Sequence, residues 1–482
     1  MASSPSNSPV RSFSPIRVLM PGFGALLGVG VLWSTGAASD GDGRPAASWT
    51  AADTVTFTRD VAPILQASCQ GCHQAGGIGP MALTTYEDAR RWGPMIKMKV
   101  LEQAMPPYHY DTHVGIQELQ NDWRLSAEEI RTIVRWVDAR APMGDPADMP
   151  PPVEWPPAGE YLLAASLGPP DLVIKADPYT VPATGQDRWW RPLTPSGITE
   201  DRCIKAIETR PTVAGRSVTH HANSTFVPAT STSEVDIVGG GGPGSVRLSE
   251  YALGKIGEIV PADACRIAPA GSNVRWDIHY YPDGTEVPND QVEVGIWFHA
   301  PEVTPESHYR QTLGLYLLAS GSGDYEIEPH GTLMTQGYHL FTTPVRIDSW
   351  QPHGHLRLVG KRLEALFPDG RRETLSMVSN WNPGWHHSHV YQEHAAPLLP
   401  AGTFIINTAW YDNTANNPYN PDPDQWAGIG DRTADEMSHA WIAVTHLDEA
   451  GHERLLSERM ESERMESERA STSASLPGRA PR

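Results

Sequence analysis

The most specific chemistry in this sequence lies at residues 69–73, where Cys69 and Cys72 enclose two residues and His73 follows directly. Two thiols at this spacing add to the vinyl groups of a haem, and the adjacent imidazole binds the iron from one side. A chance pair of cysteines or a zinc site is the alternative interpretation. The motif therefore predicts covalently attached haem c and redox chemistry outside the cytoplasm.

A second axial ligand to the haem iron is expected downstream. Met105 is the best candidate, because the two prolines that follow it would hold the loop rigid and a thioether ligand raises the reduction potential of the iron. Four other side chains compete for this role: Met81, Met95, Met98 and His109. The segment resembles class I-type cytochrome c domains, in which Cys-x-x-Cys-His precedes a Met-Pro-Pro segment and a final helix.

Three groups of histidines farther along the chain have the residue types of a metal site. His220 and His221 are adjacent, and adjacent strand residues point to opposite faces, so both can bind one ion only at a strand end or a bulge. His279 lies in a strand-like run, where a lone histidine is more often structural. His353 and His355, separated by one glycine, would share a face of a strand and can converge on one ion.

Residues 200–447 resemble the copper type II ascorbate-dependent monooxygenases, the group of peptidylglycine α-hydroxylating monooxygenase and dopamine β-monooxygenase. The resemblance is distinctive in the C-terminal half and looser in the N-terminal half. Its motifs are Thr219-His220-His221, Ile278-His279-Tyr280, Pro352-His353-Gly354-His355-Leu356-Arg357, Leu399-Pro400-Ala401-Gly402-Thr403, Ala409-Trp410-Tyr411-Asp412-Asn413-Thr414, Asn416-Asn417-Pro418 and Thr433-Ala434-Asp435-Glu436-Met437.

The resemblance implies two sandwiches that face each other across a solvent cleft, each with one copper ion. One copper would be held by His220, His221 and His279. The other, catalytic copper would be held by His353, His355 and Met437. In the family the second copper binds O2 and abstracts hydrogen from a substrate C–H bond, and the first delivers an electron that comes from ascorbate. Two imidazoles and a thioether favour Cu(I), which agrees with this assignment, and zinc is the alternative metal.

Some residues depart from the family pattern or extend it. No convincing match exists for the residues that bind the peptide carboxylate, so amidation of peptides is not expected. A histidine-rich segment could be a third metal site, a metal entry patch or a solvated loop, of which the loop is favoured: His386, His387, His389 and His394. Asp435 and Glu436 are expected to orient their loop rather than to bind copper.

The elements that must position these groups change in character along the chain. Residues 55–146 have helical periodicity, including an apolar face just before the cysteines and a capping box that opens a helix over Ser126–Ala139. A Pro-rich linker at 147–169 precedes strand-like runs at 217–220, 274–280 and 292–298, separated by turns. The expected fold is a small all-α cytochrome c domain (55–146) followed by two all-β, jelly-roll-like antiparallel sandwiches (170–320 and 321–449). Residues 450–482 are expected to be a disordered tail.

The N-terminus and the composition indicate an exported protein. Arg11 and Arg17 precede an apolar run over residues 18–33, and small residues follow at 36–38, so residues 1–38 read as a signal peptide and 39–54 as a linker. This places the protein in the periplasm or outside the cell, or anchored in a membrane if the signal stays uncleaved. Cys203 and Cys265 would then be a disulfide or two buried thiols. The net charge of −20 excludes a basic nucleic-acid-binding surface.

These observations favour an exported copper monooxygenase fused to a cytochrome c, with O2 and a small-molecule or peptide substrate. The haem would exchange electrons with the copper pair, and an external reductant or redox protein would supply them. The alternative is a non-catalytic electron-transfer or copper-binding protein whose sandwiches bind a partner. A haem protein with purely structural β domains is a third reading.

Overall fold

The computed structural model describes residues 54–474 apart from residues 109, 121, 156, 158, 232–244, 253–256, 263, 305–307, 317–324 and 431. The predicted signal peptide, most of the linker after it and the alternative haem ligand His109 lie outside the described residues. Within them, no helix combines the length and the apolar character needed to cross a membrane.

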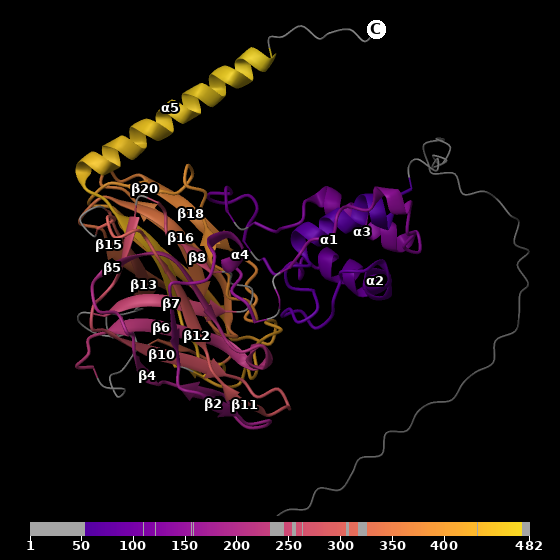
Figure 1. The fold of residues 1–482 in the computed structure, drawn as a ribbon, viewed down its shortest axis with the longest axis horizontal. Helices are drawn as coiled ribbons and strands as arrows, with labels where there is room; N and C mark the ends of the chain where they lie inside the picture. Colours follow the sequence, from indigo (N-terminus) through magenta and orange to yellow (C-terminus); the bar gives the residue numbers. More distant parts are fainter. Residues whose placement is uncertain are drawn as a thin grey trace, which may run out of the picture. The chain divides into compact units, whose positions relative to one another are not determined.

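Helices occupy the segment around the cysteine motif (Figure 1). They are η2 (Phe57–Val61), α1 (Ala62–Ser68), α2 (Tyr86–Leu101) and α3 (Ala127–Asp138). The predicted capping box is present, since Ser126 accepts from the Glu129 amide and Glu129 accepts from the Ser126 amide. The helices pack around the buried Phe57, Leu65 and Trp136. α1 ends at Ser68, directly before Cys69. The packing of its buried face therefore determines where the cysteine motif begins.

The rest of the chain is mostly antiparallel sheet. The largest sheet has the order β1 (Leu172–Lys175), β12 (Glu293–Phe298), β5 (Arg202–Arg210), β9 (Ala264–Ala268), β13 (His308–Tyr316), β23 (His439–His446), β16 (Val345–His353) and β19 (His389–Val390), with β8 (Glu258–Ile259) on β5 and β20 (Leu398–Leu399) on β16. A five-stranded sheet contains β3 (Arg188–Trp190), β10 (Asn273–Tyr280), β6 (Thr219–Val227) and β7 (Val246–Ala252), with β4 (Leu193–Pro195) on β10.

Three smaller sheets and three short helices complete the β region. The sheets are β15 (Thr332–Leu340), β21 (Phe404–Asp412), β17 (Leu358–Leu366) and β18 (Arg372–Val378), then β2 (Tyr179–Val181) with β11 (Val287–Asp290), and β14 (Glu326–Ile327) with β22 (Ala427–Gly428). The helices are η3 (Pro146–Asp148), α4 (Ala164–Leu167) and η4 (Ala214–Ser217). The predicted strand at 217–220 therefore starts later, because Ser217 ends a helical turn and β6 begins at Thr219.

Two apolar cores lie in the β region, as two packed pairs of layers require. The N-terminal core contains Trp276 and Tyr280, and the C-terminal core contains Trp350 and Ile442. The sheets nevertheless continue from one half into the other, because β13 pairs in parallel with β9 and antiparallel with β23. β13 lies in the range predicted for the first sandwich, but it pairs over more residues with β23 of the second half than with β9 of the first.

A disulfide joins Cys203 on β5 to Cys265 on β9, with 4.9 Å between their Cα atoms. The two strands are hydrogen-bonded neighbours in the large sheet. Of the two sequence-based interpretations of this cysteine pair, the structure contains the disulfide.

The expectation of a disordered tail from residue 450 is wrong for most of its length. Glu449–Ala474 form a helix, α5 (Figure 1). A five-residue repeat gives no apolar stripe, but it does not prevent a helix built from good helix formers. Ion pairs between Arg454 and Glu458 and between Arg464 and Glu468 have the i,i+4 spacing that stabilises a charged helix.

Candidate metal centre

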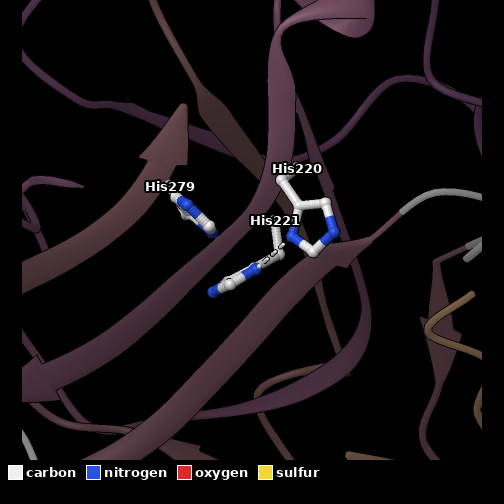
Figure 2. A group of neighbouring side chains, drawn as sticks. All are labelled: His220, His221 and His279. Carbon is white, nitrogen blue, oxygen red and sulfur yellow. Dashed lines mark hydrogen bonds between the residues drawn. The ribbon is translucent and has the colours of Figure 1, made fainter. Parts of the chain in front are cut away.

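A bulge at the start of β6 brings two adjacent histidines to the same place. His279 of β10 pairs with His221 of β6, but the next pair is Tyr280 with Thr219, so His220 is the extra residue. An extra residue in one strand kinks it and re-aims its side chain. His220 therefore turns toward His221 instead of pointing to the opposite face (Figure 2). A bulge is one of the two arrangements, with a strand end, in which the sequence allowed both imidazoles to bind one ion.

His279 completes a group of three imidazoles. One ring nitrogen from each of His220, His221 and His279 lies within 4.8 Å of the others. Figure 2 shows the three rings converging from β6 and β10. The Nε2–H of His279 donates to Asp187 Oδ2 at 3.1 Å, and its buried Nδ1 has no hydrogen-bond partner among the described residues. A carboxylate only accepts, so it fixes the proton on Nε2 and leaves the lone pair on Nδ1.

The spacing within this group fits a metal ion. The Nδ1 atoms of His220 and His221 are 3.1 Å apart. Imidazole nitrogens bind first-row metals at about 2.0–2.1 Å, so two of them on one ion lie about 2.9 to 3.4 Å apart. Burial lowers the pKa of both histidines and brings that of His279 to about 4, so all three are neutral near pH 7. Neutral imidazole is the form that binds metals.

The second predicted group lies where β16 ends. His353 is the last residue of β16 and His355 follows the strand, with 5.3 Å between their ring centroids. His355 Nδ1–H donates to the carbonyl of Asp435 at 3.1 Å, so the lone pair of this imidazole is on Nε2. His353 is 2% exposed, and its Nδ1 has no hydrogen-bond partner in the described part of the chain.

The chain around Met437 lies directly against this second group. Glu436 is buried and accepts from the backbone amides of His355 at 3.1 Å and Arg357 at 2.5 Å. A Cβ atom on Gly354 would be 3.0 Å from the Met437 carbonyl oxygen. The same Cβ would lie 2.5 Å from Leu358 Cδ2, so glycine at this position lets both the Leu358 side chain and the Met437 backbone approach closely. Glu436 orients this loop, as the sequence suggested.

The two groups are not separated in this structure. The ring centroids of His221 and His353 are 6.1 Å apart. Two contacts cross between the halves nearby: Thr433 donates from Oγ1 to Asp187 at 2.9 Å, and Gln351 on β16 donates to Glu250 on β7. The expectation of two copper cages across a solvent cleft is therefore not met in the described residues, and the histidines form one cluster.

Sequence reasoning missed a further member of this cluster. His386, in the loop before β19, lies with its ring centroid 4.5 Å from that of His353, 5.3 Å from His220 and 5.6 Å from His221. It is 3% exposed, so the interpretation of this segment as a solvated loop is wrong. A run of histidines after a tryptophan carries no periodic signal that would place one of them here. His394 is exposed, as a solvated loop residue would be.

The neighbours of His386 are buried for a different reason. His387 lies beside Tyr108 and Trp123, with centroid distances of 6.3 and 5.7 Å. His389 Nδ1 lies 3.3 Å from the Tyr108 hydroxyl. Tyr108 belongs to the segment after Met105 and is part of the C-terminal core. The loop that carries His386 therefore packs against the segment predicted to ligate the haem.

The cysteine motif leaves its two thiols free of any disulfide and orients its histidine through one hydrogen bond. Cys69 and Cys72 are free thiols, in contrast to the disulfide pair. His73 Nδ1–H donates to the Met81 carbonyl at 3.0 Å, which places the imidazole lone pair on Nε2, where an axial ligand needs it. A Cβ on Gly79 would lie 2.6 Å from His73 Nδ1, so the loop closes tightly on this ring. The residues present therefore fit a haem.

The structure places Met105 just after α2 but does not join it to His73. Its amide donates to the Lys99 carbonyl at 3.2 Å, and its side chain is 38% exposed. Met95 and Met98 are similarly exposed, at 41% and 40%, while Met81 touches His73 only through its carbonyl. The choice among these sulfur ligands stays a prediction.

A small polar pocket lies beside the second group. Arg247 and Glu250 from β7, Gln351 from β16 and Trp441 from β23 line it, together with Ser388. The Trp441 ring centroid is 4.9 Å from that of His353. The guanidinium of Arg247 lies 5.0 Å over the same indole. The pocket thus contains charged side chains of both signs, and Trp441 lies between Arg247 and His353.

Comparisons with known proteins add no family. No protein-family model and no curated protein matches this chain. Among solved structures, an infectious bursal disease virus Gt strain structure is 10% identical over 57% of this chain and 70% of its own, with a TM-score of 0.16. Vicilin from Solanum lycopersicum (tomato) is 10% identical over 57% and 74%, with a TM-score of 0.13. A mutant oxalate decarboxylase of Bacillus subtilis is 9% identical over 59% and 88%, with a TM-score of 0.11. Likenesses this weak carry no argument about fold or function.

Proposed function

We propose that this chain is an exported oxidoreductase that contains haem c and copper and hydroxylates a C–H bond of an organic substrate with O2. Its β region would be two jelly-roll-like halves of the copper monooxygenase type, and its helices a cytochrome c domain. The observation that carries the proposal is the imidazole cluster itself. A cage of three neutral histidines lies next to a His-x-His pair that packs against the chain around Met437.

The donors of the two groups suit different tasks. His220, His221 and His279 supply only imidazole nitrogens, which suit an ion that takes and passes on single electrons. His353 and His355 with the thioether of Met437 favour Cu(I), the state that meets O2. Copper bound there would supply the redox chemistry. The chain contributes orientation, through Asp187 at His279 and through Asp435 and Glu436 at His355.

The contacts of the helical segment support an electron path between haem and copper. Arg216 donates to the Gly76 carbonyl at 2.8 Å. Gly76 lies three residues after His73, and Arg216 lies four residues before His220. The cysteine motif and the first histidine group are thus connected through one hydrogen bond and two short stretches of chain. Haem held by Cys69, Cys72 and His73 would supply one-electron redox chemistry next to the histidines that would hold copper, and an external reductant would provide the electrons.

The pocket beside His353 suggests a polar substrate. Arg247 and Glu250 pair with each other at 3.9 Å and, with Gln351, line this pocket with polar groups, which suit a small polar molecule better than a hydrocarbon. The departure from the peptide-binding pattern of the family agrees with a small molecule rather than a peptide.

Metal analysis followed by oxygen uptake tests this proposal. Purified protein should contain one iron and two copper ions per chain, and it should consume O2 with a reductant in the presence of small polar substrates. Met437→Ala and His353→Ala should abolish uptake while the haem spectrum stays unchanged. His394→Ala, in an exposed position of the same histidine-rich segment, is the matched control. Iron without copper, or zinc in both groups, would refute the proposal.

One observation favours the alternative of a non-catalytic electron-transfer protein. His353 and His386 are 2% and 3% exposed, so the cluster offers little surface to a substrate in this arrangement. In that case copper would still be bound, wild-type protein would consume no O2 with any of the substrates, and Met437→Ala would change only the copper potential.

A further inference from the structure

His386 lies between the two predicted copper groups and belongs to neither. Its ring touches His353 from one side and His220 and His221 from the other. The three distances, 4.5, 5.3 and 5.6 Å between ring centroids, leave no room for another side chain between them. His386 is therefore in contact with both groups, with ring neighbours in His353 and in His220 and His221.

The surroundings of His386 do not explain its burial as an ordinary core residue. A buried imidazole usually donates from one nitrogen and accepts at the other, because a buried polar atom without a partner loses its hydrogen bonds to water and gains none. His386 Nδ1 has no hydrogen-bond partner among the described residues, and the same holds for the Nδ1 atoms of His353 and His279. Three unsatisfied imidazole nitrogens within one cluster point to a shared cationic ligand.

Charge supports the same conclusion. Asp187 is the carboxylate that contacts the histidine rings of the cluster, and its contact is to His279 and not to His386. No carboxylate hydrogen bond to the His386 ring is found among the described residues. A soft metal ion can satisfy these nitrogens, since it accepts lone pairs from neutral imidazoles without any carboxylate.

We propose that His386 is a copper ligand that the family pattern does not assign, and that it joins the two groups into one coupled two-copper centre. The proposal rests on the proposed function, since it takes copper as the metal. His386 has its nearest ring neighbour in His353, so we assign it to the ion of the second group. This ion then has three imidazole donors and the thioether of Met437. The first group keeps its own three histidines.

The consequence is a magnetic interaction that separated ions would lack. The ring centroids of His221 and His353 are 6.1 Å apart and His386 contacts both, so two Cu(II) ions in these groups would be near neighbours. Fully loaded, oxidised protein should therefore show a broadened electron paramagnetic resonance spectrum with a half-field transition. Protein loaded with less than one copper per chain should show an ordinary isolated signal.

The test compares His386→Gln with His387→Phe in the full-length protein. Glutamine keeps much of the volume and polarity of His386 but lacks the imidazole, and His387, its neighbour, contacts Tyr108 and Trp123. We expect His386→Gln to weaken the binding of one of the two Cu(I) ions at least tenfold in competition with a chromophoric chelator and to remove the half-field transition. His387→Phe should bind both ions as the wild type does.

The outcomes separate this proposal from the proposed function. If wild-type protein binds two copper ions, and His386→Gln binds both with unchanged affinity and an unchanged spectrum, His386 is not a ligand and only this inference fails. If wild-type protein binds no copper, both fail. Circular dichroism of the metal-free variants shows whether they fold, and if His386→Gln does not, His386→Asn is measured in its place under the same criteria.

Discussion

Asp187 offers a direct test of the first histidine group, because it contacts one of the three imidazoles by a hydrogen bond. Its Oδ2 accepts from His279 Nε2 at 3.1 Å, and the Asp187 side chain is half-buried. Asp187→Asn keeps the shape but removes the obligatory acceptor. An amide can face His279 with either its oxygen or its NH2 group, so the proton of His279 is no longer held on Nε2.

The expected loss of affinity follows from the role of such partners. Changing a group that orients a ligating histidine typically lowers metal affinity 10- to 100-fold, or about 1.4 to 2.8 kcal/mol. Protonation cannot be the cause of the loss. Burial lowers the pKa of His279 to about 4, while Asp187 acts in the opposite direction and raises it. Removing the carboxylate lowers this pKa further, so His279 stays neutral and the fold-loss should be equal at pH 6.5 and pH 8.

Competition for Cu(I) with a chromophoric chelator measures this directly. Asp277→Asn is the matched control, since Asp277 lies on β10 two residues before His279 but pairs with Arg191 at 2.6 Å. Asp187→Asn should lose affinity at one of two copper sites, and Asp277→Asn at neither. Equal affinity in wild type and Asp187→Asn, or a loss that grows as the pH falls, would refute the assignment of His279 as an oriented ligand.

Three further changes test the scaffold. Replacing Cys203 and Cys265 with serine removes a disulfide that closes a loop with a sequence separation of 62. Guanidinium unfolding should show a free energy of unfolding lower by up to about 4 kcal/mol. Wild-type protein with the disulfide reduced should be as stable as the variant. Lys361 is fully buried, and burial lowers its pKa well below 10.5. The unfolded chain therefore binds more protons than the folded chain, and the stability of the wild type rises with pH between the two pKa values. Urea unfolding should show Lys361→Met to be more stable than the wild type by about 1–3 kcal/mol at pH 7, with a smaller difference toward pH 10. In Gly354→Ala the new Cβ would lie 3.0 Å from the Met437 carbonyl, so thermal unfolding should show a loss of about 1–3 kcal/mol and X-ray absorption a loss of sulfur from the Cu(I) shell.

Sequence reasoning reached those parts of the site whose geometry is local. Adjacent histidines can share an ion only at an irregular strand position, and the bulge at His220 is that irregularity. The capping box at Ser126 likewise needs only four consecutive residues to be read. These features depend on the periods of strands and helices, which can be recognised from a few consecutive residues of the sequence.

The parts that sequence reasoning missed depend on contacts between distant segments. Asp187 meets His279 across 92 positions, and nothing near Asp187 distinguishes it from the other acidic residues. His386 reaches the cluster through a loop whose path is set by the packing of His387 and His389 on Tyr108. The continuous sheet depends on the pairing of β13 with β9. The residue pattern of a short strand does not indicate which other strand it pairs with. The helix α5 was missed because the absence of an apolar stripe was taken as the absence of a helix.

The closed arrangement of the two halves over the histidine cluster leads to one more prediction. Thr433 donates to the same Asp187 oxygen that accepts from His279, so this hydrogen bond links the Met437 loop to the first histidine group. Thr433→Val removes the link but leaves the contact between Asp187 and His279. A hydrogen bond to a charged acceptor contributes about 1.5 kcal/mol or more, so the ratio of closed to open forms should fall at least about tenfold.

Copper should then dissociate from Thr433→Val faster than from the wild type, while its coordination by the ligands stays the same. The rate at which an excess of external chelator removes Cu(I) should rise about tenfold in Thr433→Val, because removal requires the cluster to become exposed. The spectrum of the bound copper should stay as in the wild type, since no ligand has changed. An unchanged rate would mean that copper exchanges without separation of the Met437 loop from Asp187, and the closed cluster would then be the only arrangement in which this protein works.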